Sequence, residues 1–127
     1  MTALTFIAPP PGLEPLREFE LTAVDGAAGL YTIQAVERPE IRIFAIDAGL
    51  HLPGYSPELP DDHAAELGVS HADEVLALVV VNPSPEGSTV NLLAPVLVNR
   101  ATGRALQLVL EDDSFPVRAE LAALAHS

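Results

Sequence analysis

Three histidines in this sequence lie near acidic residues, and an Asp–His pair can serve general acid–base catalysis or help to hold a metal ion. His51, His63 and His71 each have an aspartate within four residues along the chain. None of them forms a recognised ligand spacing such as His-Glu-x-x-His, and a chain rich in acids readily brings Asp near His. We therefore expect solvated or capping histidines. A small β-barrel metal-binding module or enzyme that uses these three residues is the alternative hypothesis.

Nucleophiles and paired carboxylates give no stronger sign of catalysis. The chain has no cysteine, which excludes disulfides, thiol nucleophiles and thiolate metal ligands, and no serine lies in a Gly-x-Ser-x-Gly elbow. The acidic runs at residues 61–62 and 111–113 are typical of solvated faces, because nothing near them indicates a substrate cleft. The sequence predicts a protein that is not an enzyme and has no catalytic residue, metal or cofactor.

The charge balance limits the possible partners. Eighteen Asp and Glu residues stand against six basic residues, all of them Arg, and the net charge is −12. Nucleic acids and anionic membranes both favour a basic surface, so we expect no direct nucleic-acid partner and no membrane partner. A basic protein partner stays open, because acidic charge speeds association with positive surfaces. The simpler explanation, that the charge keeps the domain soluble, stays open as well.

The elements that carry these residues are expected to be strands of a single domain. A chain of 127 residues has room for one domain, and 49% hydrophobic residues argue against disorder. Twelve prolines and eight glycines divide it into short runs rich in Val, Ile and Leu, a pattern typical of short strands. The expected strands cover residues 4–7, 18–24, 30–36, 41–47, 75–81, 90–99 and 105–110.

Two segments are expected to be helical. Residues 60–67 begin with proline and acids and are followed by Gly68, which is the usual asymmetry of a helix. Residues 114–125 have Pro116 early and apolar residues at the spacing of one helix face. The fold prediction is therefore all-β: a compact antiparallel, barrel-like domain with one short helix and a C-terminal helix.

The strand expected at residues 90–99 contains Pro95, which cannot donate a hydrogen bond to a sheet ladder. A proline there indicates an edge position or a bulge, where another chain could approach. A binding role for Asn91 and Pro95 and a fixed bulge that closes the fold both stay open, as does a dimerising domain that pairs such edges. The loop that follows is expected to turn a hairpin at Gly103.

The sequence also carries a prediction of location. The N-terminus has no basic region followed by a long apolar stretch, and the longest strongly apolar run, residues 75–81, is too short to cross a bilayer. We therefore expect a cytoplasmic protein.

The segment around Pro95 resembles a known family. Residues 88–99, followed by Gly103 and by the Gln-Leu-Val-Leu run that starts at Gln107, are similar to the FliW family of flagellar assembly factors. That family has a Thr-x-Asn-Leu-x-Ala-Pro-x-x-x-Asn strand, a short hairpin loop and a Gln-x-x-Leu strand. Other positions that fit its pattern, in the same order along the chain, are Gly12, Leu13, Phe19, Leu21, Gln34, Pro39, Ile41 and Tyr55.

The resemblance implies a binding protein. FliW-like proteins bind flagellin and also CsrA, a small RNA-binding translational repressor, so that export of flagellin frees the protein to capture CsrA and relieves repression of flagellin translation. The residues we expect at the partner surface are Asn91, Leu92 and Pro95 on the interrupted strand, with Tyr55, Glu58, Asp61 and Asp62. The family usually has a further N-terminal hairpin before the segment that corresponds to residues 4–7. We therefore expect residues 1–127 to form a single FliW-like β domain without that hairpin.

Overall fold

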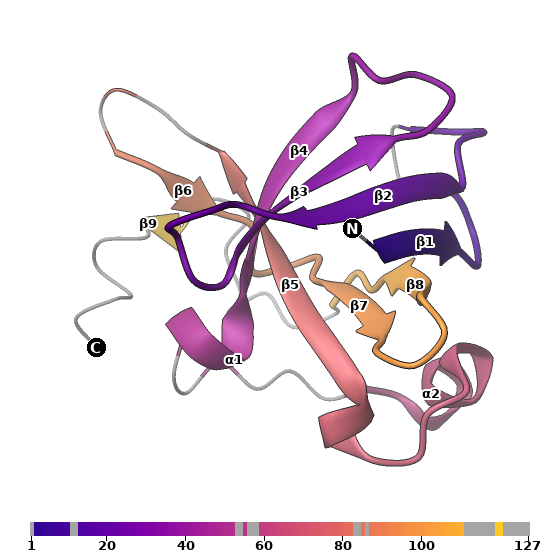
Figure 1. The fold of residues 1–127 in the computed structure, drawn as a ribbon. Coiled ribbons are helices and arrows are strands. Elements are labelled where there is room, and N and C mark those ends of the chain that lie inside the picture. The colour runs from indigo at the N-terminus through magenta and orange to yellow at the C-terminus, as the bar shows by residue number, and fades with distance from the viewer. Residues whose placement is uncertain are drawn as a thin grey trace.

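Figure 1 shows strands that wind round a common core, with short helices on the flanks. The computed structural model describes residues 2–10, 13–52, 55, 59–82, 85, 87–110 and 119–120. In chain order its elements are β1 (Thr2–Phe6), β2 (Glu18–Ala23), β3 (Leu30–Ala35), β4 (Arg42–Asp47), α1 (Ala48–His51), α2 (Asp61–Leu67), the 3₁₀ turn η1 (Ala72–Glu74), β5 (Val75–Asn82), β6 (Thr89–Val90), β7 (Val96–Asn99), β8 (Arg104–Gln107) and β9 (Ala119–Glu120). The prediction of an all-β domain is confirmed.

Seven of these strands close into a barrel. They are hydrogen-bonded in the order β4, β3, β2, β1, β8, β7, β5, and a further pairing between β4 and β5 joins the two ends of that series. β6 pairs with the last residues of β5, and β9 pairs with β6. The barrel-like architecture is therefore confirmed, and it closes with the strands of this chain alone.

The antiparallel barrel contains one parallel pair of strands, which the sequence did not predict. β1 and β8 run parallel, with Thr5 opposite Arg104 and Phe6 opposite Ala105, while the other pairings are antiparallel. The reason is arithmetic: strand direction cannot alternate all the way round a ring of seven strands. One parallel pair is the smallest departure that lets such a ring close.

The barrel interior is filled by alternate residues of its strands, as a half-buried strand pattern requires. Leu4 and Phe6 of β1 and Phe19 of β2 are at most 2% exposed, and the rings of Phe6 and Phe19 meet edge to face at 5.2 Å. Two smaller apolar clusters lie elsewhere on the strands. One includes Ala48 of α1, and the other includes Leu67 of α2.

The helix expected at residues 60–67 is confirmed as α2. It ends at Gly68, whose φ of +78° is the left-handed conformation that glycine adopts without a Cβ penalty. The one-turn helix α1 was not expected. It begins because the Asp47 side chain accepts a hydrogen bond from the Gly49 backbone N–H (2.9 Å), which caps the helix start directly after β4.

The helix expected at residues 114–125 is corrected at the two positions that the structure describes. Ala119 and Glu120 form β9, with Ala119 opposite Val90 and Glu120 opposite Thr89. Ladder hydrogen bonds to β6 outweigh the helical preference of Ala and Glu, because propensity is a weak prior beside tertiary pairing. The rest of that segment lies outside the described residues.

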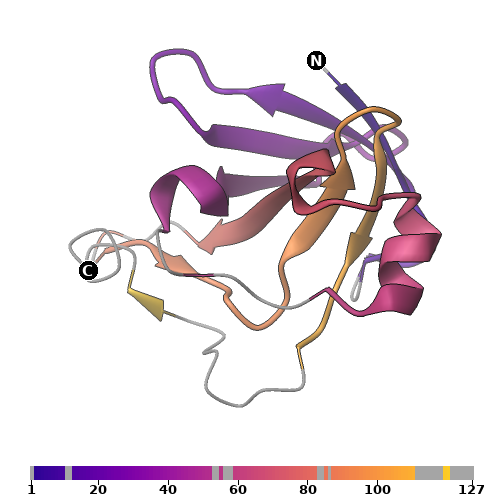
Figure 2. The same ribbon diagram turned by 90° about the horizontal axis from the view of Figure 1, so that it is seen from below.

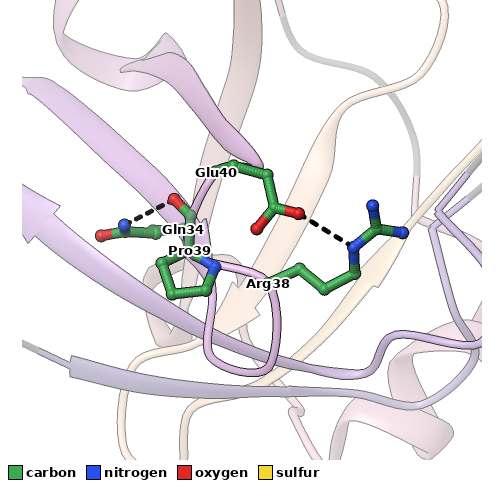
Figure 3. A network of polar contacts seen from close by, with 4 residues as sticks. All are labelled: Gln34, Arg38, Pro39 and Glu40. Carbon is green, nitrogen blue, oxygen red and sulfur yellow. Dashed lines mark hydrogen bonds and ion pairs between the residues drawn. The ribbon is translucent and has the colours of Figure 1, made fainter.

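The turn between β3 and β4 is closed by a side chain (Figure 3). Gln34 Nε2 donates to the carbonyl oxygen of Pro39 at 2.7 Å. Beside it, Arg38 Nε lies 3.2 Å from Glu40 Oε2. Backbone hydrogen bonding first, and the bond from Arg38 second, lower the pKa of Glu40. Both charged side chains are more than half exposed, so the ion pair contributes little to the stability of the turn.

Candidate functional site: the proline bend

The strand expected at residues 90–99 is broken in the structure. β6 ends at Val90 and β7 begins at Val96, and residues 91–95 between them form what we call the proline bend. Asn91 N–H still donates to Val80 O of β5 (3.0 Å), so the chain leaves the sheet directly after Asn91. The interruption that Pro95 predicts is present.

Residues from two other segments hold the proline bend through its carbonyl groups. All four carbonyl oxygens of residues 92–95 accept a hydrogen bond. The donors are the Tyr55 hydroxyl to Leu92 (2.6 Å), Leu110 N–H to Leu93 (2.8 Å), Gln107 Nε2 to Ala94 (3.0 Å) and Leu108 N–H to Pro95 (2.9 Å). Buried backbone groups need such partners, so the proline bend is a fixed part of the fold.

Asn91 organises the start of the proline bend. Its Oδ1 accepts hydrogen bonds from the backbone N–H groups of Leu93 (3.0 Å) and Ala94 (3.2 Å). This is an Asx-type turn, in which a short polar side chain replaces the ladder partner that the backbone has lost. Two roles were left open for Asn91, partner binding and a fixed bulge that closes the fold. The structure shows the second directly.

Leu92 and Pro95 lie inside the protein. Leu92 is 6% exposed, and Pro95 is among the largest fully buried side chains. Side chains buried to this degree influence a partner only through the shape that they give the surface. Partner binding by these two residues, and by the proline bend as a whole, therefore stays a prediction, and the burial favours an indirect role for Leu92 and Pro95.

Tyr55 lies against the proline bend, as its inclusion among the expected site residues requires. It is partly buried and packs with Leu92 and Leu52 in the apolar cluster beside α1. Its hydroxyl donates to Leu92 O, and burial raises its pKa to about 12. At neutral pH this hydroxyl is therefore a hydrogen-bond donor that holds the bend.

The two described acidic residues that were expected at the site lie elsewhere. Asp61 and Asp62 are exposed in the first turn of α2, and Glu58 lies outside the described residues. α2 packs over β7 and β8 through Leu67, and Figure 1 and Figure 2 place it on the opposite flank of the barrel from α1. Those expected site residues that the structure describes thus form two groups, one at the proline bend and one on α2.

The histidines of the alternative hypothesis do not come together. His51 Nε2 lies 2.7 Å from Ala28 O, His63 Nδ1 lies 3.4 Å from Glu66 Oε1 within α2, and His71 is exposed before η1. Across the described part of the chain, no three side chains of the metal-ligating types are close enough to hold an ion. The arrangement of the histidines therefore gives the metal or enzyme hypothesis no support.

A cavity of about 240 Å³ opens at the mouth of the barrel beside the proline bend. Its walls include Val80 and Ile43 together with two amide side chains, Asn91 and Gln107. The sequence contained a signal for Gln107: Ala105, two positions earlier in β8, points into the barrel core, so Gln107 must point the same way. A polar residue at an inward position of a strand was that signal.

Comparison with known proteins now gives the family. A model of the family described as FliW protein matches residues 1–121. The chain belongs to the FliW family. Among its relatives, the flagellar assembly factor FliW of Syntrophotalea carbinolica is 35% identical over 113 residues, covering 88% of this chain and 81% of that protein. The flagellar assembly factor FliW of Thermotoga neapolitana is 29% identical over 111 residues, covering 85% of this chain and 74% of that protein.

A solved FliW structure has the same fold. The crystal structure of the flagellar assembly factor FliW superimposes with a TM-score of 0.86 at 21% identity, covering 94% of this chain and 84% of that one. In the described part of the present chain, no helix is long and apolar enough to span a membrane.

The FliW pattern in this chain consists largely of residues that hold backbone. Asn91, Gln107, Tyr55 and Gln34 each bond a main-chain group at the proline bend or at the β3–β4 turn. Asn99, which is 5% exposed, donates to Leu67 O (2.8 Å) and accepts from two N–H groups of the following loop (2.9 and 3.3 Å). The resemblance therefore identified side chains that fix the fold.

Proposed function

We propose that this protein is a non-catalytic binder that couples flagellin synthesis to flagellin export. In this proposal it binds either flagellin or a CsrA-like translational repressor, and export of flagellin leaves it free to capture the repressor. Membership of the FliW family, whose curated relatives carry the name flagellar assembly factor, is the observation that supports the proposal. Such a switch works by mass action between two ligands for one protein, and it requires no chemistry. Its place would be the cytoplasm, where messenger RNA is translated.

The charge of the chain fits one of these partners. A repressor that binds RNA presents a basic surface, and this chain carries a net charge of −12. Opposite charges speed diffusional encounter, and salt screens that effect. Of the acids expected at the partner surface, Asp61 and Asp62 are exposed in the first turn of α2. We propose that these two aspartates face the repressor.

Calorimetric titration of the purified protein with flagellin and with the CsrA-like regulator of the same source tests the proposal. We expect heat with each partner, and we expect flagellin to prevent binding of the regulator. The absence of heat with both partners would overturn the proposed function. The rate of association with the regulator, measured by stopped flow, should fall steeply as the salt concentration rises. A rate that does not depend on salt would mean that the acidic charge serves solubility and does not speed binding.

A matched pair of variants tests the role of α2. The double variant Asp61→Asn/Asp62→Asn and the control Asp25→Asn/Glu37→Gln each remove two exposed charges, so the net charge is the same in both. If α2 faces the regulator, the first variant slows association more than the control. Equal slowing would mean that only the total charge steers the encounter, and it would remove Asp61 and Asp62 from the site.

A further inference from the structure

In Figure 1, α2 and the loop that joins β7 to β8 lie on the same flank of the barrel. Between this loop and η1 the surface forms a groove of about 400 Å³, which we call the η1 groove. Asp73 and Glu74 of η1 line one wall and residues 100–102 of the loop line the other, together with Gly68 at the end of α2. Asp73 and residues 100–102 are exposed, so an entering group can contact both walls.

The walls of the η1 groove are held in place by hydrogen bonds. Arg100 N–H donates to Glu74 O (3.0 Å), which ties the loop to η1, and Ser70 N–H donates to Glu74 Oε2 (3.0 Å). Asn99 fixes the loop to α2, because it bonds two N–H groups of the loop and the carbonyl oxygen of Leu67. The groove is therefore formed before a partner arrives, and binding there loses little conformational entropy.

The charged side chains of the groove have unused hydrogen-bonding capacity. Among the described residues, neither the Asp73 carboxylate nor the Arg100 guanidinium has a hydrogen bond or an ion pair. Within the same part of the chain, Glu74 uses only Oε2, so its Oε1 is free as well. The groove thus offers two carboxylates against one guanidinium, and negative charge is in excess.

The exposure of these charges decides between a small ligand and a protein. An exposed ion pair contributes about 0.2–1 kcal/mol, whereas even millimolar binding requires about 4 kcal/mol. A small free ligand would therefore be held weakly. The groove fits one side chain of a larger protein surface, which adds contacts outside the groove. Because negative charge is in excess, the side chain that complements it is basic.

We propose that the η1 groove binds one Lys or Arg side chain of the CsrA-like regulator. The cation meets Asp73 and Glu74 Oε1, and Arg100 donates to a main-chain carbonyl oxygen of the same segment. This inference deepens the proposed function and rests on it for the identity of the partner. The charge argument selects the regulator, because a protein that binds RNA has basic side chains at its surface. Gly68, which lines the groove, ends the helix whose first turn carries the two aspartates proposed to face the regulator.

Two variants test the groove, one through its charge and one through its space. Asp73→Lys reverses an exposed charge in the groove, and its control Asp25→Lys makes the same change in the turn between β2 and β3. Ala101→Phe fills the groove without changing the charge, and its control Ala23→Phe adds the same ring at another exposed alanine. In calorimetric titrations with the regulator, we expect each groove variant to weaken binding about tenfold and each control less than about twofold.

The two variants together distinguish a bound side chain from charge steering alone. If Asp73→Lys weakens binding and Ala101→Phe does not, the charge acts from outside the groove and the inference is overturned. If both groove variants bind the regulator as tightly as their controls, the inference fails and the proposed function stands. Circular dichroism and the thermal midpoint show whether each variant is folded, and we expect both to be unchanged because these side chains are exposed.

Peptide probes test the groove without the regulator. Acetyl-Ala-Arg-Ala-amide carries a basic side chain with its main-chain carbonyl groups, and the same peptide with citrulline in place of arginine has the same shape without the charge. In nuclear magnetic resonance spectra, we expect the arginine peptide to shift the backbone amide signals of Ala101 and Thr102 at roughly 10–100 mM, and the citrulline peptide to bind about fivefold more weakly. Equal effects of the two peptides would overturn the inference. If the unmodified protein does not bind the regulator, the proposed function fails, and the two peptides then decide whether the groove recognises a basic side chain.

Discussion

Removing one hydroxyl group should weaken the whole domain, because the Tyr55 hydroxyl holds the proline bend. Its oxygen lies 2.6 Å from Leu92 O, and Leu92 is 6% exposed. Tyr55→Phe keeps the ring packing and leaves that carbonyl without the Tyr55 donor. Leaving a buried acceptor unpaired costs about 1–3 kcal/mol, a large share of the 5–15 kcal/mol that typically stabilises a domain.

The second tyrosine is a matched control. Tyr31 lies in β3, is also partly buried, and its hydroxyl has no hydrogen-bond partner among the described residues. Tyr31→Phe should therefore change the free energy of unfolding by less than about 0.5 kcal/mol. Urea unfolding followed by circular dichroism measures both variants. With a typical slope of about 2 kcal/mol per molar urea, Tyr55→Phe should lower the midpoint by about 1 M at an unchanged slope. If the two variants lose equal stability, the hydrogen bond to Leu92 does not hold the proline bend.

The remaining predictions concern the same tyrosine, one glycine and one asparagine. In the Tyr31→Phe protein, ultraviolet titration should find Tyr55 ionising near pH 12. Because the folded-state pKa of Tyr55 lies above the usual 10.0, the stability contributed by its neutral hydroxyl is complete below pH 10 and is lost as the pH rises to about 12. Ionisation near pH 10 would refute the burial of this hydroxyl. Gly103→Ala should lower the free energy of unfolding by about 3 kcal/mol and Gly26→Ala by about 1 kcal/mol. Both residues have φ of +79°, but only a Cβ at Gly103 meets the Ala3 carbonyl oxygen. Equal losses of stability in thermal unfolding would contradict this reasoning. Asn99→Ala should cost about 2–4 kcal/mol and speed amide hydrogen exchange in α2, and unchanged exchange there would show that Asn99 does not anchor that helix.

Features with a local cause could be predicted from the sequence. The strands at residues 18–24 and 30–36 follow from the pattern of polar and apolar residues between turn residues. They differ from β2 and β3 by one residue at one end. α2 follows from its acidic start and from Gly68 at its end. The interruption at Pro95 follows from the missing N–H. Each of these depends on residues a few positions apart.

Features that depend on distant pairing could not be predicted. The pairing of Ala119 with Val90 overrides a helical pattern, and no local signal indicates it. The parallel pair depends on the total number of strands in the ring. Within the candidate site, the pattern identified Asn91 and Tyr55, but it could not show that Leu92 is buried, because that follows from the packing of α1 onto the barrel.

The parallel pair of β1 and β8 also sets the order in which the chain can fold. Thr5 meets Arg104, about a hundred residues later, so the ring stays open until the segment around residue 104 has been made. At a synthesis rate of about 5–20 residues per second, β1 waits roughly 5–20 s on the ribosome with one edge unpaired. Contacts of such long sequence separation slow folding, because the entropy of loop closure is lost before the contact forms. A chain shortened before residue 104 therefore loses the strand that closes the barrel, and the early strands are left as an open sheet with a free edge for another chain.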